Sequence, residues 1–217
     1  MREAMTEDKD WRRAAGERLI EQLSTHIQDR RVLEAIAAVP RDLFVPPSLR
    51  SEAWENTSLP IASGQTISQP SVVARMCELL ELDGSETVLD VGTGSGYHAA
   101  VLARLARRIV SIERHPRLSQ QARAALAAAR VEHVTLVVGD GSRGYPALAP
   151  YEAINVAAGS EHGVPGALVD QLAPGGRLVA PVDDGAQRLT VIRRREDGLE
   201  RTQYERVRFV PLVSEDQ

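Results

Sequence analysis

The sequence predicts an α/β fold: a doubly wound, mostly parallel sheet with an N-terminal helical cap and a C-terminal antiparallel hairpin. Three observations lead to this prediction. Beyond residue 86, short apolar runs of strand length alternate with segments of helical periodicity, an order typical of parallel strands with covering helices. Residues 1–70 lack this alternation. Residues 187–213 contain two strand-like runs around the turn dipeptide Asp197-Gly198.

The composition is that of an ordinary globular domain. Of the 217 residues, 43% are hydrophobic and 26% are charged. We therefore expect a single domain over residues 1–217. Within it, residues 1–70 would form the helical cap and a substrate loop, and residues 71–217 would form a cofactor-binding α/β core.

The N-terminal region divides into helical and irregular parts. Apolar residues at helical spacing between residues 11 and 38 predict two short helices. The second should end at Pro40, because proline lacks the backbone donor that a helix needs. Residues 41–70 are rich in Pro, Ser, Gly and Thr and predict a long loop, a feature that is often functional. Pro70 should open an amphipathic helix.

The remaining elements follow in alternation. Strands are expected at 86–92, 107–113, 133–140, 152–158 and 176–182, and helices at 96–106, 115–129 and 164–173. Strands this apolar are usually buried on both faces of a parallel sheet. Residues 187–196 and 201–213 predict an antiparallel hairpin that closes one edge.

Composition also excludes several classes of protein. No apolar run approaches the ~20 residues of a membrane helix, and the charged N-terminus lacks the apolar stretch of a secretory signal. The single cysteine, Cys77, rules out an internal disulfide and a multi-cysteine metal site. The formal net charge of −4 gives no long-range attraction for nucleic acid. We expect a cytoplasmic protein without metal, membrane or nucleic-acid partners, and we favour a monomer.

A glycine-rich run follows the first strand of the alternating region, in the order DVGTGSG. Glycines allow sharp bends and close approach of a ligand to the backbone. A dinucleotide fold requires G-x-G-x-x-G, whereas this run is G-x-G-x-G with an acid two residues before it. That acid suits a cationic ligand such as S-adenosylmethionine better than a pyrophosphate. The candidate cofactor-binding residues here are Asp90, Gly92, Thr93, Gly94, Ser95 and Gly96.

Two further acids stand at the ends of the next two strands. Glu113 could accept both hydroxyl groups of a ribose, although a surface acid is the alternative. Asp140 could accept from an adenine amino group, with Gly141 leaving room for the ring, although it could equally cap a helix. Because parallel strands end at one edge of the sheet, these acids together predict S-adenosylmethionine binding.

The pattern as a whole resembles the protein-L-isoaspartate (D-aspartate) O-methyltransferase family from about residue 30 to residue 213. The segments that carry the resemblance are VPRDLFVP (39–46), AWEN (53–56), LPI (59–61), GQTISQP (64–70), LDVGTGSGY (89–97), GDG (139–141), APYEAI (149–154), QLAPGGRLVAPV (171–182) and VRFVPL (207–212). The glycine run alone indicates only a class I S-adenosylmethionine-dependent methyltransferase fold. GQTISQP and FVPL are far more specific.

The resemblance implies methyl transfer to the α-carboxylate of L-isoaspartyl and D-aspartyl residues in damaged proteins, which starts repair through a succinimide. Such a carboxylate is already ionised at neutral pH, so no strong general base is required. The resemblance also implies an active-site role for Ser68, which we expect, with Thr66, to orient the acceptor carboxylate and not to act as a nucleophile. The alternative is that Ser68 caps the following helix.

The resemblance also suggests which neighbours line the site. The expected residues at the junction of cofactor and substrate are Gln65, Thr66, Ile67 and Ser68, and the expected substrate contacts are Ile61, Ser68 and Val213.

Some residues depart from the family pattern. Asn155 interrupts a strand where an apolar residue is common, and the stretch from 157 to 165 is about one residue longer than usual. Two histidines are lesser candidates: His98 could approach the cofactor, and His162 could touch substrate. The departures leave an alternative open, namely a related carboxyl methyltransferase that acts on one dedicated peptide or small molecule.

Overall fold

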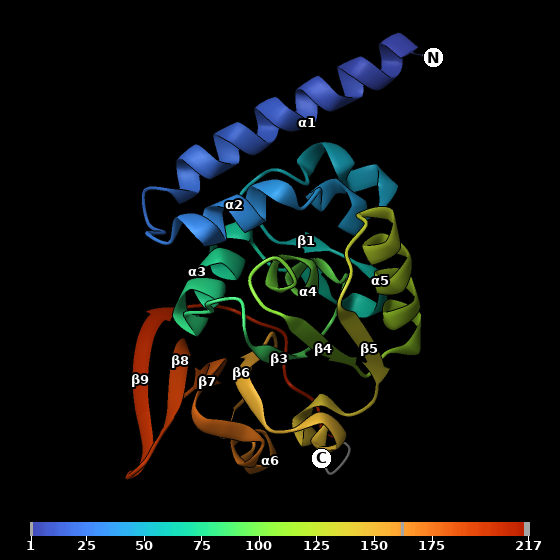
Figure 1. The fold of residues 1–217 in the computed structure, drawn as a ribbon. Coiled ribbons are helices and arrows are strands. Elements are labelled where there is room, and N and C mark those ends of the chain that lie inside the picture. Colours follow the sequence, from blue (N-terminus) through green and yellow to red (C-terminus); the bar gives the residue numbers. More distant parts are fainter. Residues whose placement is uncertain (1, 162, 215–217) are drawn as a thin grey trace.

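A seven-stranded sheet forms the centre of the computed structural model, which describes residues 2–161 and 163–214 (Figure 1). Its strands are β3 (Thr87–Val91), β4 (Arg108–Glu113), β5 (Val134–Val138), β6 (Tyr151–Val156), β7 (Leu172–Asp183), β8 (Gln187–Arg195) and β9 (Gly198–Arg206). The strand order is β5-β4-β3-β6-β7-β8-β9. Strands β3 to β7 pair in parallel, and β8 and β9 are antiparallel. The predicted mostly parallel sheet and C-terminal hairpin are therefore confirmed.

Helices cover the two faces of this sheet unevenly. The helices are α1 (Arg2–Leu23), α2 (Arg30–Ala38), α3 (Pro70–Leu80), α4 (Tyr97–Leu102), α5 (Pro116–Ala128) and α6 (Gly166–Asp170). Figure 1 shows α1 and α2 stacked above α3 and α4, with α6 on the opposite side of the sheet. Successive strand residues point to opposite faces, so Val88 joins the core under the stacked helices and Leu89 joins the core beside α6.

The boundaries of two helices differ from the sequence prediction. Helix α1 starts at Arg2, so it is longer than the short helix expected from residue 11. The charged residues before Trp11 carry no apolar periodicity that would indicate a helix. Helix α6 has only five residues, because β7 already begins at Leu172 within the segment expected to be helical.

The last segment corrects a further expectation. Strand β9 ends at Arg206, so residues 207–213 do not continue the hairpin. They cross from the edge of the sheet back toward its middle (Figure 1). There Gly159 N donates to Val210 O at 2.8 Å and Leu212 N donates to Gly159 O at 2.7 Å. The FVPL motif therefore lies beside the loop that follows β6.

The irregular stretch predicted over 41–70 contains only short elements. These are 3-10 turns at Arg41–Phe44, Pro47–Glu52 and Ala62–Gly64, and the two-residue strands β1 (Leu59–Pro60) and β2 (Thr66–Ile67), which pair with each other. This small ladder places Thr66 opposite Pro60 and Ile67 opposite Leu59. The loop therefore has a defined backbone path.

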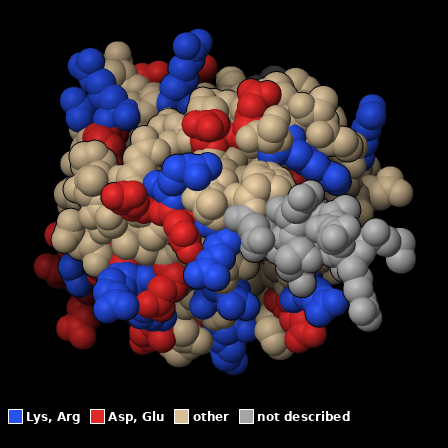
Figure 2. Space-filling model, turned by 90° about the horizontal axis from the view of Figure 1, so that it is seen from above, with Lys and Arg blue, Asp and Glu red and all other residues tan. Residues whose placement is uncertain are grey.

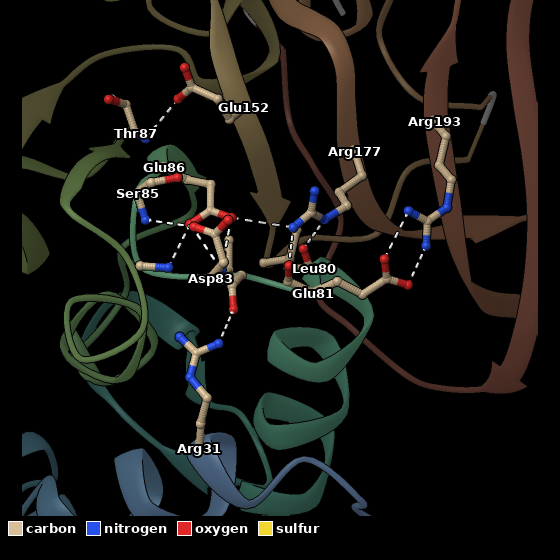
Figure 3. A network of polar contacts seen from close by, with 12 residues as sticks. Arg31, Leu80, Glu81, Asp83, Ser85, Glu86, Thr87, Glu152, Arg177 and Arg193 are labelled. Atoms are coloured by element: carbon tan, nitrogen blue, oxygen red, sulfur yellow. Dashed lines mark hydrogen bonds and ion pairs between the residues drawn. The ribbon is translucent and has the colours of Figure 1, made fainter.

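A polar cluster joins the end of α3 to strand β7 (Figure 3). Arg177 of β7 donates to the carbonyls of Leu80 and Glu81, where α3 ends. The same guanidinium lies 3.3 Å from the carboxylate of Glu86, which also accepts from the backbone N–H groups of Asp83 at 2.9 Å and Gly84 at 3.0 Å. This cluster fixes the turn from which β3 starts.

The outer face of the cap carries charges of both signs. Over the described part of this face, Figure 2 shows basic and acidic side chains interspersed, without an extended patch of one sign. Among the described residues, no helix is long and apolar enough to cross a membrane.

Candidate functional site

The largest group of predicted site residues meets at the carboxyl ends of the central strands. The chain proceeds from β3 to β4 and β5 on one side and from β6 to β7 on the other, and ligands of such sheets bind where the order reverses. The pocket at this point is lined by Gln65, Thr66, Val91, Gly92, Gly94, Ile112, Glu113, Arg114, His115, Gly141, Ala157, Ala158, Val210, Pro211, Leu212 and Val213. It therefore joins the loop before α3, the sheet and the C-terminal segment.

The glycine run supplies a strained turn at the base of this pocket. Gly92, Gly94 and Gly96 have φ values of 93°, 53° and 88°, a region that favours glycine. Gly96 also lies where a Cβ would come within 3.1 Å of Ala122 Cβ on α5. Gly92 and Gly94 line the pocket, whereas Gly96 serves the packing of α4 against α5.

Glu113 is held rigidly at the pocket wall. One carboxylate oxygen accepts from Gly94 N at 2.8 Å, and the other accepts from His115 N at 2.9 Å. A carboxylate has about four lone-pair sites. Each oxygen therefore keeps acceptor capacity for a hydroxyl group in the pocket.

Asp90 lies behind the glycine run, not in the pocket wall. It is fully buried, and its oxygens accept from Ser111 Oγ at 2.7 Å and Asn155 Nδ2 at 2.7 Å. Burial raises the pKa of Asp90 to about 6; the two hydrogen bonds oppose this shift and the nearby charge of Glu113 adds to it. Ser111 Oγ also lies 2.6 Å from Thr93 Oγ1, which links the carboxylate to the turn.

Asn155 extends this polar chain into the core. Its Nδ2 lies 3.2 Å from His98 Nδ1, and His98 Nε2 lies 3.5 Å from Cys77 Sγ. Burial lowers the pKa of His98 to about 3, so its imidazole is neutral. The structure therefore places His98 in this chain and outside the pocket. It also explains the polar residue within β6, which sequence periodicity marks only as an interruption.

Asp140 and Gly141 follow β5, and Gly141 lines the pocket whereas Asp140 does not. Asp140 caps the 3-10 turn Gly141–Arg143 by accepting from Ser142 N at 2.9 Å and Ser142 Oγ at 2.7 Å. A Cβ on Gly141 would lie only 2.6 Å from Val91 Cγ1. The close packing of the Gly141 backbone against Val91 is thus possible only without a side chain.

A second cavity adjoins the first and contains Ser68. It is lined by Ser58, Thr66, Ser68, Gln69, Val72, Ala157, Arg206, Val207, Arg208, Phe209 and Val210. Three residues, Thr66, Ala157 and Val210, line both cavities. Ser68 does not cap the next helix, because α3 begins at Pro70 with Gln69 at its N-cap and no side-chain hydrogen bond there. Its hydroxyl is thus available to a ligand in the second cavity.

A buried arginine fixes the backbone at Ser68. Arg41 is fully buried and donates to the carbonyls of Ala53 at 2.7 Å, Ser68 at 2.9 Å and Thr57 at 3.1 Å. Its guanidinium also lies 4.8 Å from the centre of the Tyr97 ring. Nothing in the local sequence pattern marks Arg41 as buried, because its three acceptors are spread over the following loop.

The remaining predicted residues lie at different places in the structure. Ile67 is buried under the β1–β2 ladder, and Thr93 is buried against Ser111. Ile61 and Ser95 line a separate apolar groove beside Phe44. Val213, expected near substrate, lies in the pocket with the glycine run.

Two further expectations from the sequence concern His162 and metal binding. His162 lies outside the described residues. Within the described residues, no group of three or more His, Cys, Asp or Glu side chains is arranged to hold a metal ion.

Known proteins are similar to this chain in sequence over most of its length. A family model for protein-L-isoaspartate (D-aspartate) O-methyltransferase matches residues 14–217. A protein-L-isoaspartate O-methyltransferase from Halorhodospira halophila is 53% identical over 200 residues, covering 91% of this chain and 90% of the relative. A second relative, protein-L-isoaspartate O-methyltransferase 2 from Archaeoglobus fulgidus, is 48% identical over 204 residues, covering 92% and 93%.

Solved structures of proteins with the same enzyme name are also similar to this chain in fold. One protein-L-isoaspartate O-methyltransferase has a TM-score of 0.82 and 28% identity, and the match covers 92% of this chain and 66% of that one. A Plasmodium falciparum structure assigned to the same enzyme class has a TM-score of 0.77 and 25% identity, covering 90% and 96%. It was solved in complex with S-adenosyl-L-homocysteine.

Proposed function

The chain belongs to the protein-L-isoaspartate (D-aspartate) O-methyltransferase family, and we propose how its own residues perform the reaction of that family. It is an S-adenosylmethionine-dependent enzyme that methylates isoaspartyl residues in proteins. The observation that carries our assignment of residues is the meeting of two cavities at Thr66, one beside the glycine run and one beside Ser68. The first would hold the methyl donor and the second the acceptor.

The residues of the first cavity fit S-adenosylmethionine. Glu113 presents a fixed carboxylate with acceptor capacity for the ribose hydroxyls. Gly141 lines the cavity without a side chain that would take the space of an adenine ring. Gly92 and Gly94 allow the methionine part to approach the backbone, and Asp90 behind them supplies negative charge toward its cationic groups. When bound, S-adenosylmethionine supplies an electrophilic methyl group on a sulfonium.

The residues of the second cavity would position the acceptor. A carboxylate is ionised at neutral pH and needs no base. Ser68 Oγ and Thr66 Oγ1 would donate hydrogen bonds to one carboxylate oxygen and leave the other free to point toward the junction of the cavities. Holding reacting atoms about 3 Å apart in line supplies much of the rate enhancement of such a transfer. Arg41 would act as a positioning residue through the carbonyl of Ser68.

A paired-peptide assay tests this assignment. Purified protein would be given a radiolabelled methyl donor and either an isoaspartyl peptide or its aspartyl twin, and base-labile label would be counted. We expect label on the isoaspartyl peptide only, and a fall in kcat of about a hundred- to a thousandfold in Ser68→Ala, typical for loss of one positioned donor. The exposed turn residue Ser85 provides the control variant Ser85→Ala.

The same assay also has outcomes that contradict the proposal. Equal labelling of both peptides would contradict the selection for isoaspartate. A Ser68→Ala variant with wild-type kcat would remove Ser68 from the acceptor site. Weaker binding of S-adenosyl-L-homocysteine in Ser68→Ala, in proportion to lost turnover, would place the residue on the donor side instead.

The expected setting of the enzyme also belongs to this proposal. The single cysteine supports a cytoplasmic location, and we favour a monomer that binds neither nucleic acid nor membranes. No observation favours a dedicated small-molecule substrate. Asn155 departs from the family pattern, but its side chain is buried against Asp90 and does not line the acceptor cavity.

A further inference from the structure

The acceptor cavity carries a positive rim. Arg206 and Arg208 both line it and are both exposed. Among the described residues that line this cavity, none is acidic. Within this described lining, a substrate that enters beside Ser68 therefore meets two guanidinium groups and no compensating carboxylate.

These two arginines differ from the others of the hairpin. Arg188 donates to Tyr204 O and Arg194 donates to Val169 O. The remaining hairpin arginines form ion pairs: Arg193 with Glu81, Arg195 with Glu200, and Arg201 with Asp184. Among the side chains of the described arginines in residues 187–208, only the guanidinium groups of Arg206 and Arg208 have no hydrogen-bond or ion-pair partner. The two guanidinium groups of this segment that are free to bind a ligand are thus the two that line the acceptor cavity.

The acceptor cavity continues into a longer groove. Val72, Arg206 and Val207 line both the cavity of Ser68 and a neighbouring groove between the α1–α2 connection, α3 and β9. In that groove Arg75 is already paired with Glu78 at 2.6 Å and Glu205 at 3.0 Å. An extended peptide advances about 3.3 Å per residue. A peptide anchored at Ser68 and leaving through this groove would pass Arg206 within its first few residues.

From this arrangement we infer that the enzyme selects isoaspartyl peptides with acidic side chains next to the isoaspartate, through Arg206 and Arg208. The inference rests on the proposed function and adds a substrate preference to it. The acceptor carboxylate must stay nucleophilic, so a close ion pair with a guanidinium would work against transfer. Neighbouring carboxylates have no such requirement and can occupy the rim, where charge attraction favours binding and screening by salt weakens it.

The test compares two isoaspartyl peptides that differ only by Glu or Gln at the positions on each side of the isoaspartate. The kcat/KM of each would be measured at low salt and in 0.5 M NaCl, an ionic strength chosen to screen exposed charges. The variants are Arg206→Gln, Arg208→Gln and the double substitution. The matched control is Arg201→Gln, which lies on β9 with Arg206, pairs with Asp184 and does not line the cavity.

We expect the wild-type enzyme at low salt to favour the Glu peptide by about three- to tenfold in kcat/KM, mainly through KM, because two exposed ion pairs supply an effect of this size. The preference should shrink in high salt and fall to near one in the double variant, while Arg201→Gln keeps it. A ratio is insensitive to a general loss of active enzyme, so a poorly folded variant does not mimic this result.

Two outcomes separate this inference from the proposed function. Methylation of both peptides with equal kcat/KM, or a preference that survives the double substitution, would overturn the inference and leave the proposed function intact. Failure to methylate either isoaspartyl peptide would overturn both.

Discussion

At the scale of single residues, one buried acid connects the fold to the donor pocket. Asp90 accepts from β4 through Ser111 and from β6 through Asn155, so it joins the two strands that flank β3. With a pKa of about 6 it is ionised at neutral pH. A buried negative charge behind the glycine run is then available to favour a ligand that carries an ammonium and a sulfonium.

This position predicts a pH dependence of donor binding. Lowering the pH through about 6 protonates Asp90 and removes its charge, so the affinity for cationic S-adenosylmethionine should fall between pH 7.5 and 5. By the same linkage, S-adenosylmethionine binds the ionised form of Asp90 more tightly and so lowers its pKa. Binding near pH 6 should therefore release protons. Calorimetry in buffers of different ionisation enthalpy measures both effects. Glu113 is the other acid facing this region.

The variant Asp90→Asn separates Asp90 from Glu113. We expect weaker binding of S-adenosylmethionine at pH 7.5 and a flatter pH profile, because the amide keeps one acceptor oxygen for its neighbours but has no charge to lose. S-adenosyl-L-homocysteine lacks the sulfonium and should show a smaller dependence in the wild type. A profile in Asp90→Asn as steep as in the wild type would assign the effect to another group.

At the scale of elements, the cluster around Arg177 sets where β3 begins. Arg177 satisfies two carbonyls at the end of α3, which a helix otherwise leaves without partners. Glu86 holds the tight turn Asp83–Gly84 through its carboxylate (Figure 3). Only 16% of the Arg177 side chain and 6% of the Glu86 side chain are exposed. An ion pair this buried is strongly coupled to the packing around it.

We expect Arg177→Met to lower the free energy of unfolding by about 2–4 kcal/mol, because it leaves a buried carboxylate and two helix carbonyls without their donor. The matched control is Arg195→Met, whose pair with Glu200 is about half exposed on both sides and should change stability by less than ~1 kcal/mol. Urea-induced unfolding of both variants measures the difference. Equal losses would show that Arg177 contributes no more than a surface ion pair.

The same scale shows how far the sequence predicts the structure. The central strands are predictable because each is a short apolar run between helical segments, and a buried strand needs no long-range information to be recognised. Helix α1 begins earlier than predicted because residues 2–10 are charged, and a solvent-exposed turn leaves no periodic signal. Residues 207–213 have a strand-like composition, yet they leave β9 because their partner is the loop at Gly159.

Among the site residues, some are likewise predictable from the local sequence and others depend on contacts with distant segments. Glu113 and Gly141 are predictable from their places at strand ends, since those ends converge in a parallel sheet. Arg41, Asn155 and the unpaired state of Arg206 depend on contacts between segments far apart in the chain. No local pattern encodes such contacts, so they are visible only in the folded molecule.

At the scale of the whole molecule, the donor pocket joins three parts of the chain. Its walls come from the loop before α3 through Gln65 and Thr66, from the sheet through Glu113, and from the C-terminal segment at 210–213. The core on the cap side also extends without interruption from α1 through α3 and α4 to the sheet. We therefore expect residues 1–217 to unfold in one cooperative transition, and a ligand in the pocket to stabilise all three parts together.

S-adenosyl-L-homocysteine provides the test of this coupling. A ligand at about 100 times its Kd stabilises the native state by about 2.7 kcal/mol, which for a domain of this size raises Tm by roughly 5–10 °C. Hydrogen exchange measured in parallel should slow in residues 62–68, in the glycine run and in residues 207–213, because each contributes to the pocket. The exposed end of the hairpin near Gly198 touches none of the pocket residues and should keep its exchange rate. If the glycine run were protected while 62–68 and 207–213 exchanged as before, the donor site would not include the acceptor loop. The two cavities would then not act as one site.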